Sequence, residues 1–203
     1  NGGSLLRCAR SKVARYVSRD AQVAAWKRGY KEECASLVNC APRVPPATVR
    51  LAARVLWRRA REAAAADGSN DDDDDEMIED GVAAAAVLGL GRGYDAVDAL
   101  GDHWERLSDS RKASLAHVSL LAAAFHAGTL GSGSTTPSPD DPDPDPNPNA
   151  ADPRHVARLL AKISCNAHTV CDEELNAIGV AVYPAAAMVN HADAPTAVQS
   201  FKG

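Results

Sequence analysis

Apolar residues recur at helical spacing in residues 40–65, which predicts an amphipathic helix. The apolar positions are Val49, Ala53, Leu56 and Ala60, and a separate stripe is formed by Arg50, Arg54, Arg58 and Arg61. Pro45 and Pro46 suit the start of a helix, and Thr48 is the expected capping residue. We interpret this segment as a scaffold helix with no site of its own.

The same spacing predicts two more helices, in residues 110–127 and 153–164. Their apolar sides are Leu115, Val118, Leu121, Ala122 and Phe125 in the first, and Ala157, Leu160 and Ile163 in the second. An apolar run in residues 178–183 predicts a strand, and we expect a turn of chain around Asn166 before it. The pattern as a whole indicates an α+β fold.

Two segments lack the apolar residues that a core requires. Residues 67–80 are mostly acidic, and residues 131–153 consist largely of Gly, Ser, Pro, Asp and Asn. Such compositions do not offset the entropy of ordering, so both segments are expected to be disordered. Residues 71–76 lack the glycine and terminal glutamate spacing of a calcium loop, and the glycines of residues 89–93 are interpreted as a turn. With 203 residues and only 4% aromatics, the remainder suffices for a modest core.

The net charge of -5 conceals an uneven distribution. The two polar segments carry 9 and 5 of the 27 acidic residues and no Lys or Arg, which leaves 13 acidic residues against 22 bases elsewhere. Many bases lie near the start of the chain, led by Arg7, Arg10, Lys12, Arg15, Arg19, Lys27, Arg28 and Lys31. This basic region is compatible with binding of nucleic acid or an acidic partner, and equally with solvated helix surfaces.

The cysteines and the lengths of the apolar runs indicate the cellular location to expect. Five cysteines without compact pairing do not form a disulfide framework. No run approaches the roughly 18 to 20 apolar residues of a membrane span, and residues 1–4 do not resemble a secretory signal. We therefore expect an intracellular location, in the nucleus or the cytoplasm, and no membrane partner. Because residue 1 is not Met, we expect the chain to be a fragment or a processed product.

The dipeptide Asn190-His191 follows an apolar run, where two polar side chains need partners if they are covered. Residues 179–196, GVAVYPAAAMVNHADAPT, and residues 164–169, SCNAHT, resemble two motifs of the SET domain in the SMYD (SET and MYND) protein-lysine methyltransferases. The resemblance implies that Asn166, Asn190 and His191 bind S-adenosylmethionine, with Ala187 and Val189 near it. Asp193 stands where that family has a zinc-binding cysteine.

Residues 8–34 resemble the second half of a MYND zinc finger, and match it well at non-ligand positions such as Tyr16, Gln22 and Trp26. The resemblance places Cys8, Ser11, Tyr30 and Cys34 at the ligand positions of one zinc, and Val17 and Ala21 at those of another. Zinc prefers four Cys or His ligands, so only Cys8 and Cys34 remain as candidate zinc ligands. Since such modules draw folding energy from zinc, we expect a loosely folded region, and zinc binding stays in doubt.

The resemblance implies four parts: a degenerate MYND-type finger in residues 1–40, a helical SET insert in 41–130 with an acidic tract near 66–80, a Pro/Asp linker in 131–153, and a core SET segment in 154–203. Its function would be S-adenosylmethionine-dependent methylation of a lysine on a histone or another protein. The family's catalytic tyrosine is expected beyond Gly203, so no residue here is assigned as catalytic. Two alternatives stay open: an inactive interaction module, and nucleic-acid binding through the basic first part.

Overall fold

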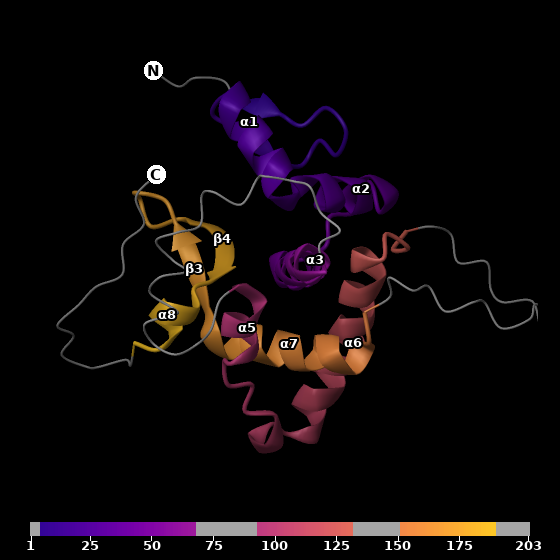
Figure 1. The fold of residues 1–203 in the computed structure, drawn as a ribbon, viewed down its shortest axis with the longest axis vertical. Coiled ribbons are helices and arrows are strands. Elements are labelled where there is room, and N and C mark those ends of the chain that lie inside the picture. The colour runs from indigo at the N-terminus through magenta and orange to yellow at the C-terminus, as the bar shows by residue number, and fades with distance from the viewer. Residues whose placement is uncertain (1–4, 68–92, 132–150, 190–203) are drawn as a thin grey trace, which may run out of the picture.

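The computed structural model describes residues 5–67, 93–131 and 151–189 (Figure 1). Helices dominate, and the strands form two separate two-stranded antiparallel sheets, β1-β2 and β3-β4. The α+β prediction is therefore confirmed. In chain order the elements are β1 (Leu6–Arg7), β2 (Arg15–Tyr16), α1 (Arg19–Ala25), the wide turn η1 (Trp26–Tyr30), α2 (Lys31–Asn39), α3 (Ala47–Ala66), α5 (Gly93–Asp98), the short η2 (Trp104–Arg106), α6 (Asp109–His126), α7 (Pro153–Asn166), β3 (Ala167–Cys171), β4 (Ala177–Val182) and α8 (Pro184–Ala187).

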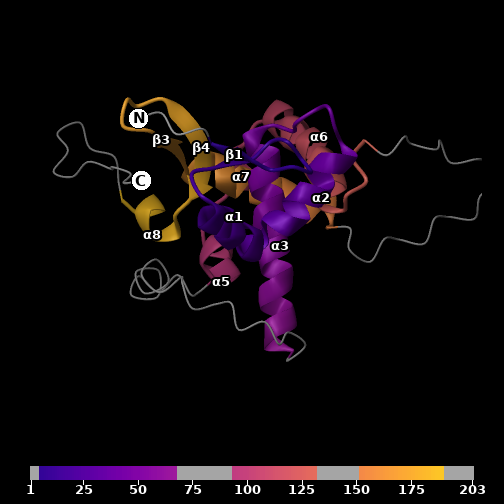
Figure 2. The ribbon, with the colours of Figure 1, turned by 90° about the horizontal axis from the view of Figure 1, so that it is seen from above.

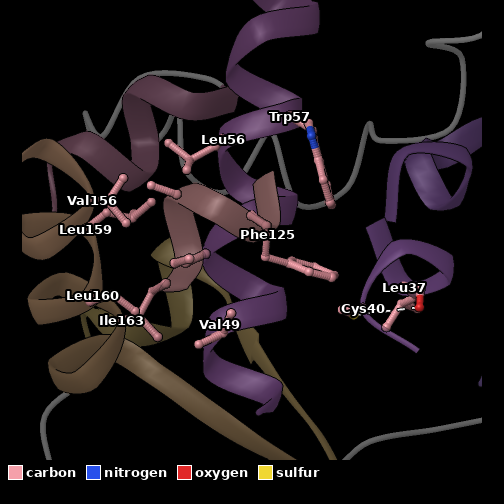
Figure 3. Packing of buried hydrophobic residues seen from close by; sticks show 14 of the residues in the cluster. Leu37, Cys40, Val49, Leu56, Trp57, Phe125, Val156, Leu159, Leu160 and Ile163 are labelled. Carbon is pink, nitrogen blue, oxygen red and sulfur yellow. Dashed lines mark hydrogen bonds between the residues drawn. The ribbon is translucent and has the colours of Figure 1, made fainter. Parts of the chain in front are cut away.

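The hydrophobic core lies where α3, α6 and α7 meet (Figure 3). Trp57 of α3 and Phe125 of α6 pack with ring centroids 5.9 Å apart. Phe125 is fully buried, and α7 contributes Val156, Leu159, Leu160 and Ile163 to the same cluster. Burying a side chain of this size contributes about 1.5–3 kcal/mol, so these few residues account for much of the stability of the three-helix packing.

Helix α3 is the predicted amphipathic helix, and it is central in Figure 1, where it is viewed nearly end on. Val49, Ala53 and Leu56 are buried as predicted, whereas Ala60 is exposed because the last turns extend beyond the core. The prediction of Thr48 as the cap is wrong. The helix begins at Ala47 after Pro46, whose φ of -53° suits a helix start, and no side chain caps it.

Helices α6 and α7 correspond to the two other predicted helices. Ser108 caps α6 by accepting a hydrogen bond from the Arg111 amide at 3.3 Å, and Asp152 caps α7 by accepting from the Arg154 amide at 2.9 Å. In α6, Leu121 is 38% exposed, so this predicted core residue lies at the edge of the apolar side. Helix α7 continues to Asn166, and the predicted turn around that residue is instead the last turn of the helix.

Residues 5–40 pack against the same core, as Figure 2 shows for α1 and α2 beside α3. Leu37 is 2% exposed, and Cys34 is fully buried. The prediction of a loosely folded first region is therefore wrong in the structure. Its packing relies on apolar contacts and on ion pairs to α3.

Several predictions fall outside the described residues. These are the acidic tract from residue 68 onward, residues 89–92 of the predicted glycine turn, residues 132–150 of the predicted linker, and Asn190, His191 and Asp193. Gly93 is described, and it begins α5 with a φ of 55°. Within the described part of the chain, no helix has the length and apolar character needed to cross a membrane.

Candidate functional site

The structure brings together the four positions that the finger resemblance assigned to one zinc. The Sγ atoms of Cys8 and Cys34 lie 3.8 Å apart, and the hydroxyl oxygens of Ser11 and Tyr30 are hydrogen-bonded at 2.6 Å. These residues are separated by up to 26 positions in sequence. The grouping implied by the resemblance is therefore present in the structure, although its contacts differ from those of a metal centre.

Short-range hydrogen bonds hold Cys8 and Ser11 in a tight turn between β1 and β2. The Cys8 amide donates to the Ala14 carbonyl at 2.9 Å, and the Lys12 amide donates to the Cys8 carbonyl at 3.0 Å. Lys12 adopts a φ of 56°, in the left-handed region that is uncommon for residues other than glycine. Tyr30 comes from η1 and Cys34 from α2, so the start of a helix closes over the turn.

The two thiols of this cluster have different proton affinities. Burial and the neighbouring Cys8 raise the pKa of Cys34. Burial also acts to raise the pKa of Cys8, but hydrogen bonds from Ser11, Arg10 and Cys34 outweigh it and lower that pKa to about 7. A thiolate at Cys8 is thus favoured more than at Cys34.

The cluster does not fit zinc. A structural zinc site needs four Cys or His ligands in a tetrahedron, whereas the other two positions here are hydroxyls bonded to each other. Among residues 5–67, 93–131 and 151–189, no group of three or more His, Cys, Asp and Glu side chains is placed to hold a metal ion. Edge-to-face packing of Tyr30 on Tyr16, with centroids 6.0 Å apart, fills this region with aromatic contacts.

The second candidate site lies at one end of the β3-β4 hairpin. The antiparallel register pairs Ala167 with Val182, so Asn166, just before β3, lies next to Tyr183, just after β4. Tyr183 leads directly into α8, which contains Ala187. The two sequence segments that resemble the SET motifs therefore meet at this end of the hairpin.

Asn166 already uses both amide hydrogens in the structure. Its Nδ2 donates to the Gly101 carbonyl at 2.9 Å and to the Lys162 carbonyl at 2.8 Å. These bonds tie the end of α7 to the loop after α5. Among the described residues, Oδ1 of Asn166 takes part in no hydrogen bond, so one acceptor with two lone pairs remains for a ligand.

Ala187 ends the four-residue helix α8, and its amide donates to the Tyr183 carbonyl at 2.9 Å. Tyr183 is 42% exposed, and its ring lies 6.1 Å from that of His168, centroid to centroid. Val189 is the last residue before the undescribed tail, so the positions of Asn190 and His191 relative to this end lie outside the structure's description.

The pairing of Glu32 and Glu33 with the arginine stripe of α3 was not predicted from the sequence. Glu33 is fully buried and accepts from Arg50 and Arg54, and Glu32 accepts from Arg61 at 2.9 Å. The adjacent Glu32-Glu33 pair next to a buried cysteine was the available signal, since buried carboxylates require cationic partners.

The chain is similar in sequence to several curated proteins that are named as lysine methyltransferases. No family model matches it. It is 27% identical over 199 residues to human histone-lysine N-methyltransferase SMYD3, covering 98% of this chain and 37% of that protein. It is 26% identical over 200 residues to zebrafish (Danio rerio) N-lysine methyltransferase SMYD2-A, covering 98% and 36%. For mouse histone-lysine N-methyltransferase Smyd1 the identity is 25% over 188 residues, covering 92% and 30%.

The chain thus spans between 30% and 37% of the length of these curated relatives. The SMYD3 and SMYD2-A alignments nevertheless run through 98% of this chain, and the Smyd1 alignment through 92%. The chain therefore resembles SMYD proteins along nearly all of its sequence.

Proposed function

We propose that this chain is part of an S-adenosylmethionine-dependent protein-lysine N-methyltransferase and supplies one side of its cofactor pocket. The observation that carries the proposal is the β3-β4 register, which brings Asn166 beside the start of α8. Histone and other protein lysines are both proposed substrates, since one relative is named a histone-lysine N-methyltransferase and another, more generally, an N-lysine methyltransferase.

The cofactor, when bound, supplies a methyl group on a sulfonium. The residues of this chain would contribute to binding and orientation rather than to proton transfer. The Oδ1 atom of Asn166 suits the cofactor's ammonium group, because an unpaired amide oxygen is an acceptor that a cation strengthens. Asn190 and His191 follow α8 closely in sequence and are proposed to add donors and acceptors to the same pocket.

In the SMYD family the catalytic tyrosine lies in a segment of the form GEExxxxY. No tyrosine of residues 1–203 lies in such a segment, so none is assigned as catalytic. Most of the rate in methyl transfer to an amine comes from alignment of the two reacting groups and from electrostatic stabilisation. A pocket that binds the cofactor but lacks the catalytic tyrosine and the substrate channel would not transfer the methyl group. We therefore expect this chain alone to be inactive.

The test is calorimetry with S-adenosylmethionine on the full-length protein, comparing Asn166→Ala with Asn166→Asp. Loss of the acceptor in Asn166→Ala is expected to weaken binding by roughly tenfold or more, as for a hydrogen bond to a charged group. Asn166→Asp keeps an acceptor but loses both donors to the Gly101 and Lys162 carbonyls. It should therefore retain affinity if Oδ1 contacts the cofactor, and lose it if the role is only structural.

Asn176→Ala is the matched control, since Asn176 lies at the opposite end of the hairpin and donates to Asp172 at 3.1 Å. It should leave cofactor affinity unchanged. Absence of any binding at millimolar cofactor in the unmodified protein contradicts the proposal.

The replacement of two zinc-ligand positions by a Ser11-Tyr30 hydrogen bond favours one second candidate, an inactive protein-interaction module. Such a module would keep the fold and bind no cofactor. Nucleic-acid binding receives less support, because the rings of Tyr30 and Trp57 beside the α3 arginines are only 5% and 9% exposed and offer no free face for base stacking.

A further inference from the structure

A cavity of about 450 Å³ lies between α1, η1 and α3, and four arginines line it. Arg54, Arg58 and Arg61 come from α3, and Arg28 comes from η1 on the opposite side. No acidic side chain of the described residues lines this cavity. Figure 2 shows α1 lying beside α3, which is how one helix face and one turn come to enclose the space.

The α3 arginines are held in place by carboxylates that lie outside the cavity lining. Glu33 accepts from Nε of Arg54 at 2.6 Å, Glu62 accepts from Nε of Arg58 at 2.6 Å, and Glu32 accepts from Arg61 at 2.9 Å. Each guanidinium has five N–H donors, and these bonds use only part of them. The pairs therefore fix the side chains and leave donors for a ligand.

Arg28 differs from the other three because it forms no ion pair with any described residue and is exposed. It follows α1 and precedes Gly29, whose φ of 107° turns the chain toward α2. The terminal nitrogens of Arg61 lie 2.8 Å from where a Gly29 Cβ would be. Glycine at this position thus leaves room for the Arg61 guanidinium against the turn.

The spacing of the arginines matches an extended peptide. Arg54 and Arg58 are four residues apart on a helix, about 6 Å along its axis. Side chains on one face of an extended strand repeat about every 6.6–6.8 Å. The facing wall consists of Ala21, Ala24 and Ala25, whose small side chains leave room for a peptide backbone. Alternate acidic residues of such a peptide could each meet one guanidinium, the geometry that carboxylates favour.

The cavity suits nucleic acid less well. Single strands bind proteins largely by stacking bases on exposed aromatic rings. The aromatic residues that line this cavity are Tyr30 and Trp57, which are only 5% and 9% exposed. They are packed into the core and offer no free ring face.

We propose that this arginine-lined cavity binds an acidic peptide segment of a partner protein, with alternate Asp or Glu side chains contacting Arg58 and Arg54 and Arg28 closing the other side. This binding site is separate from the β3-β4 end and does not rest on the proposed cofactor role. It uses the net positive charge of the first part of the chain for protein recognition.

The test measures anisotropy of a fluorescein-labelled peptide of alternating Glu and Ser residues with the full-length protein. The double variant Arg28→Gln/Arg58→Gln leaves the buried Glu33 and its partners intact. It should bind at least about tenfold more weakly, because two charge-assisted contacts with the peptide are lost. The matched control Arg15→Gln/Arg43→Gln removes two exposed arginines outside the cavity lining and should change affinity less than twofold.

Equal losses in the two double variants would show a non-specific charge effect and overturn the site. Tighter binding of an oligo-thymidine strand, lost selectively in Arg28→Gln/Arg58→Gln, would assign the cavity to nucleic acid and overturn the peptide proposal. A third variant replaces Asp71–Asp75 with Asn. If the peptide binds only to that variant, the chain's own acidic run is the occupant, and the assignment to a partner protein is wrong. Circular dichroism melting confirms that each variant is folded.

Discussion

Glu33 is the residue whose partners we expect to matter most for folding of the finger-like region. Its side chain is fully buried, and its two oxygens accept from Arg50 Nε at 2.7 Å and from Arg54 Nε at 2.6 Å. The two arginines differ from it, because their side chains are 26% and 53% exposed. Removing the anion and removing the cations should therefore have unequal costs.

Glu33→Gln leaves two cations that both reach water, and the amide oxygen still accepts one hydrogen bond. The expected cost is about 1.5–3 kcal/mol of unfolding free energy, that of one charge-assisted hydrogen bond. The double variant Arg50→Met/Arg54→Met keeps much of the side-chain volume but leaves a carboxylate buried without a cation. Breaking a buried ion pair in this way costs about 3–5 kcal/mol.

Urea unfolding followed by circular dichroism measures both values, with the slope of free energy against urea as a check on two-state behaviour. The single variant Arg54→Met is the control, since Arg50 still neutralises Glu33, and its cost should fall between the two. The reasoning is refuted if Glu33→Gln destabilises the protein as much as Arg50→Met/Arg54→Met does.

Two further predictions concern the finger-like cluster and a half-buried histidine, His155. Ser11→Cys/Tyr30→His rebuilds a Cys₃His set with the two buried cysteines, so it should bind one zinc per chain and gain thermal stability with zinc. Stoichiometric zinc in the unmodified protein would contradict the conclusion that the present cluster does not fit zinc. Burial and Arg59 lower the pKa of His155 from 6.5, and its Nε2 accepts from Arg59, which only a neutral ring allows. The stability that His155 contributes is therefore complete above pH 6.5 and is lost as the pH falls below it. Urea unfolding at pH 7.5 and 5.5 measures the decrease in unfolding free energy between the two pH values. This decrease should be smaller for His155→Gln than for the unmodified protein. An equal decrease in the two proteins would argue against this assignment.

The helices could be predicted from sequence because their apolar spacing is a local property. Val49, Leu56 and Phe125 are buried where periodicity placed them. Element ends were less well predicted, since the start of α3 depends on Pro46 rather than on a side-chain cap, and α7 continues two residues beyond the predicted end to Asn166. Caps and last turns depend on hydrogen bonds with neighbouring segments, which periodicity does not record.

The resemblance of the sequence to a MYND finger indicated which residues of the finger-like region belong together, and Cys8, Ser11, Tyr30 and Cys34 do meet. Only the tertiary structure decided what they do there, a thiol contact beside a hydroxyl hydrogen bond. It likewise decided that the donors of Asn166 serve the main chain and that the arginines of α3 enclose a cavity. Residue type sets which bonds a side chain can form, but packing of distant segments sets which partners come within reach.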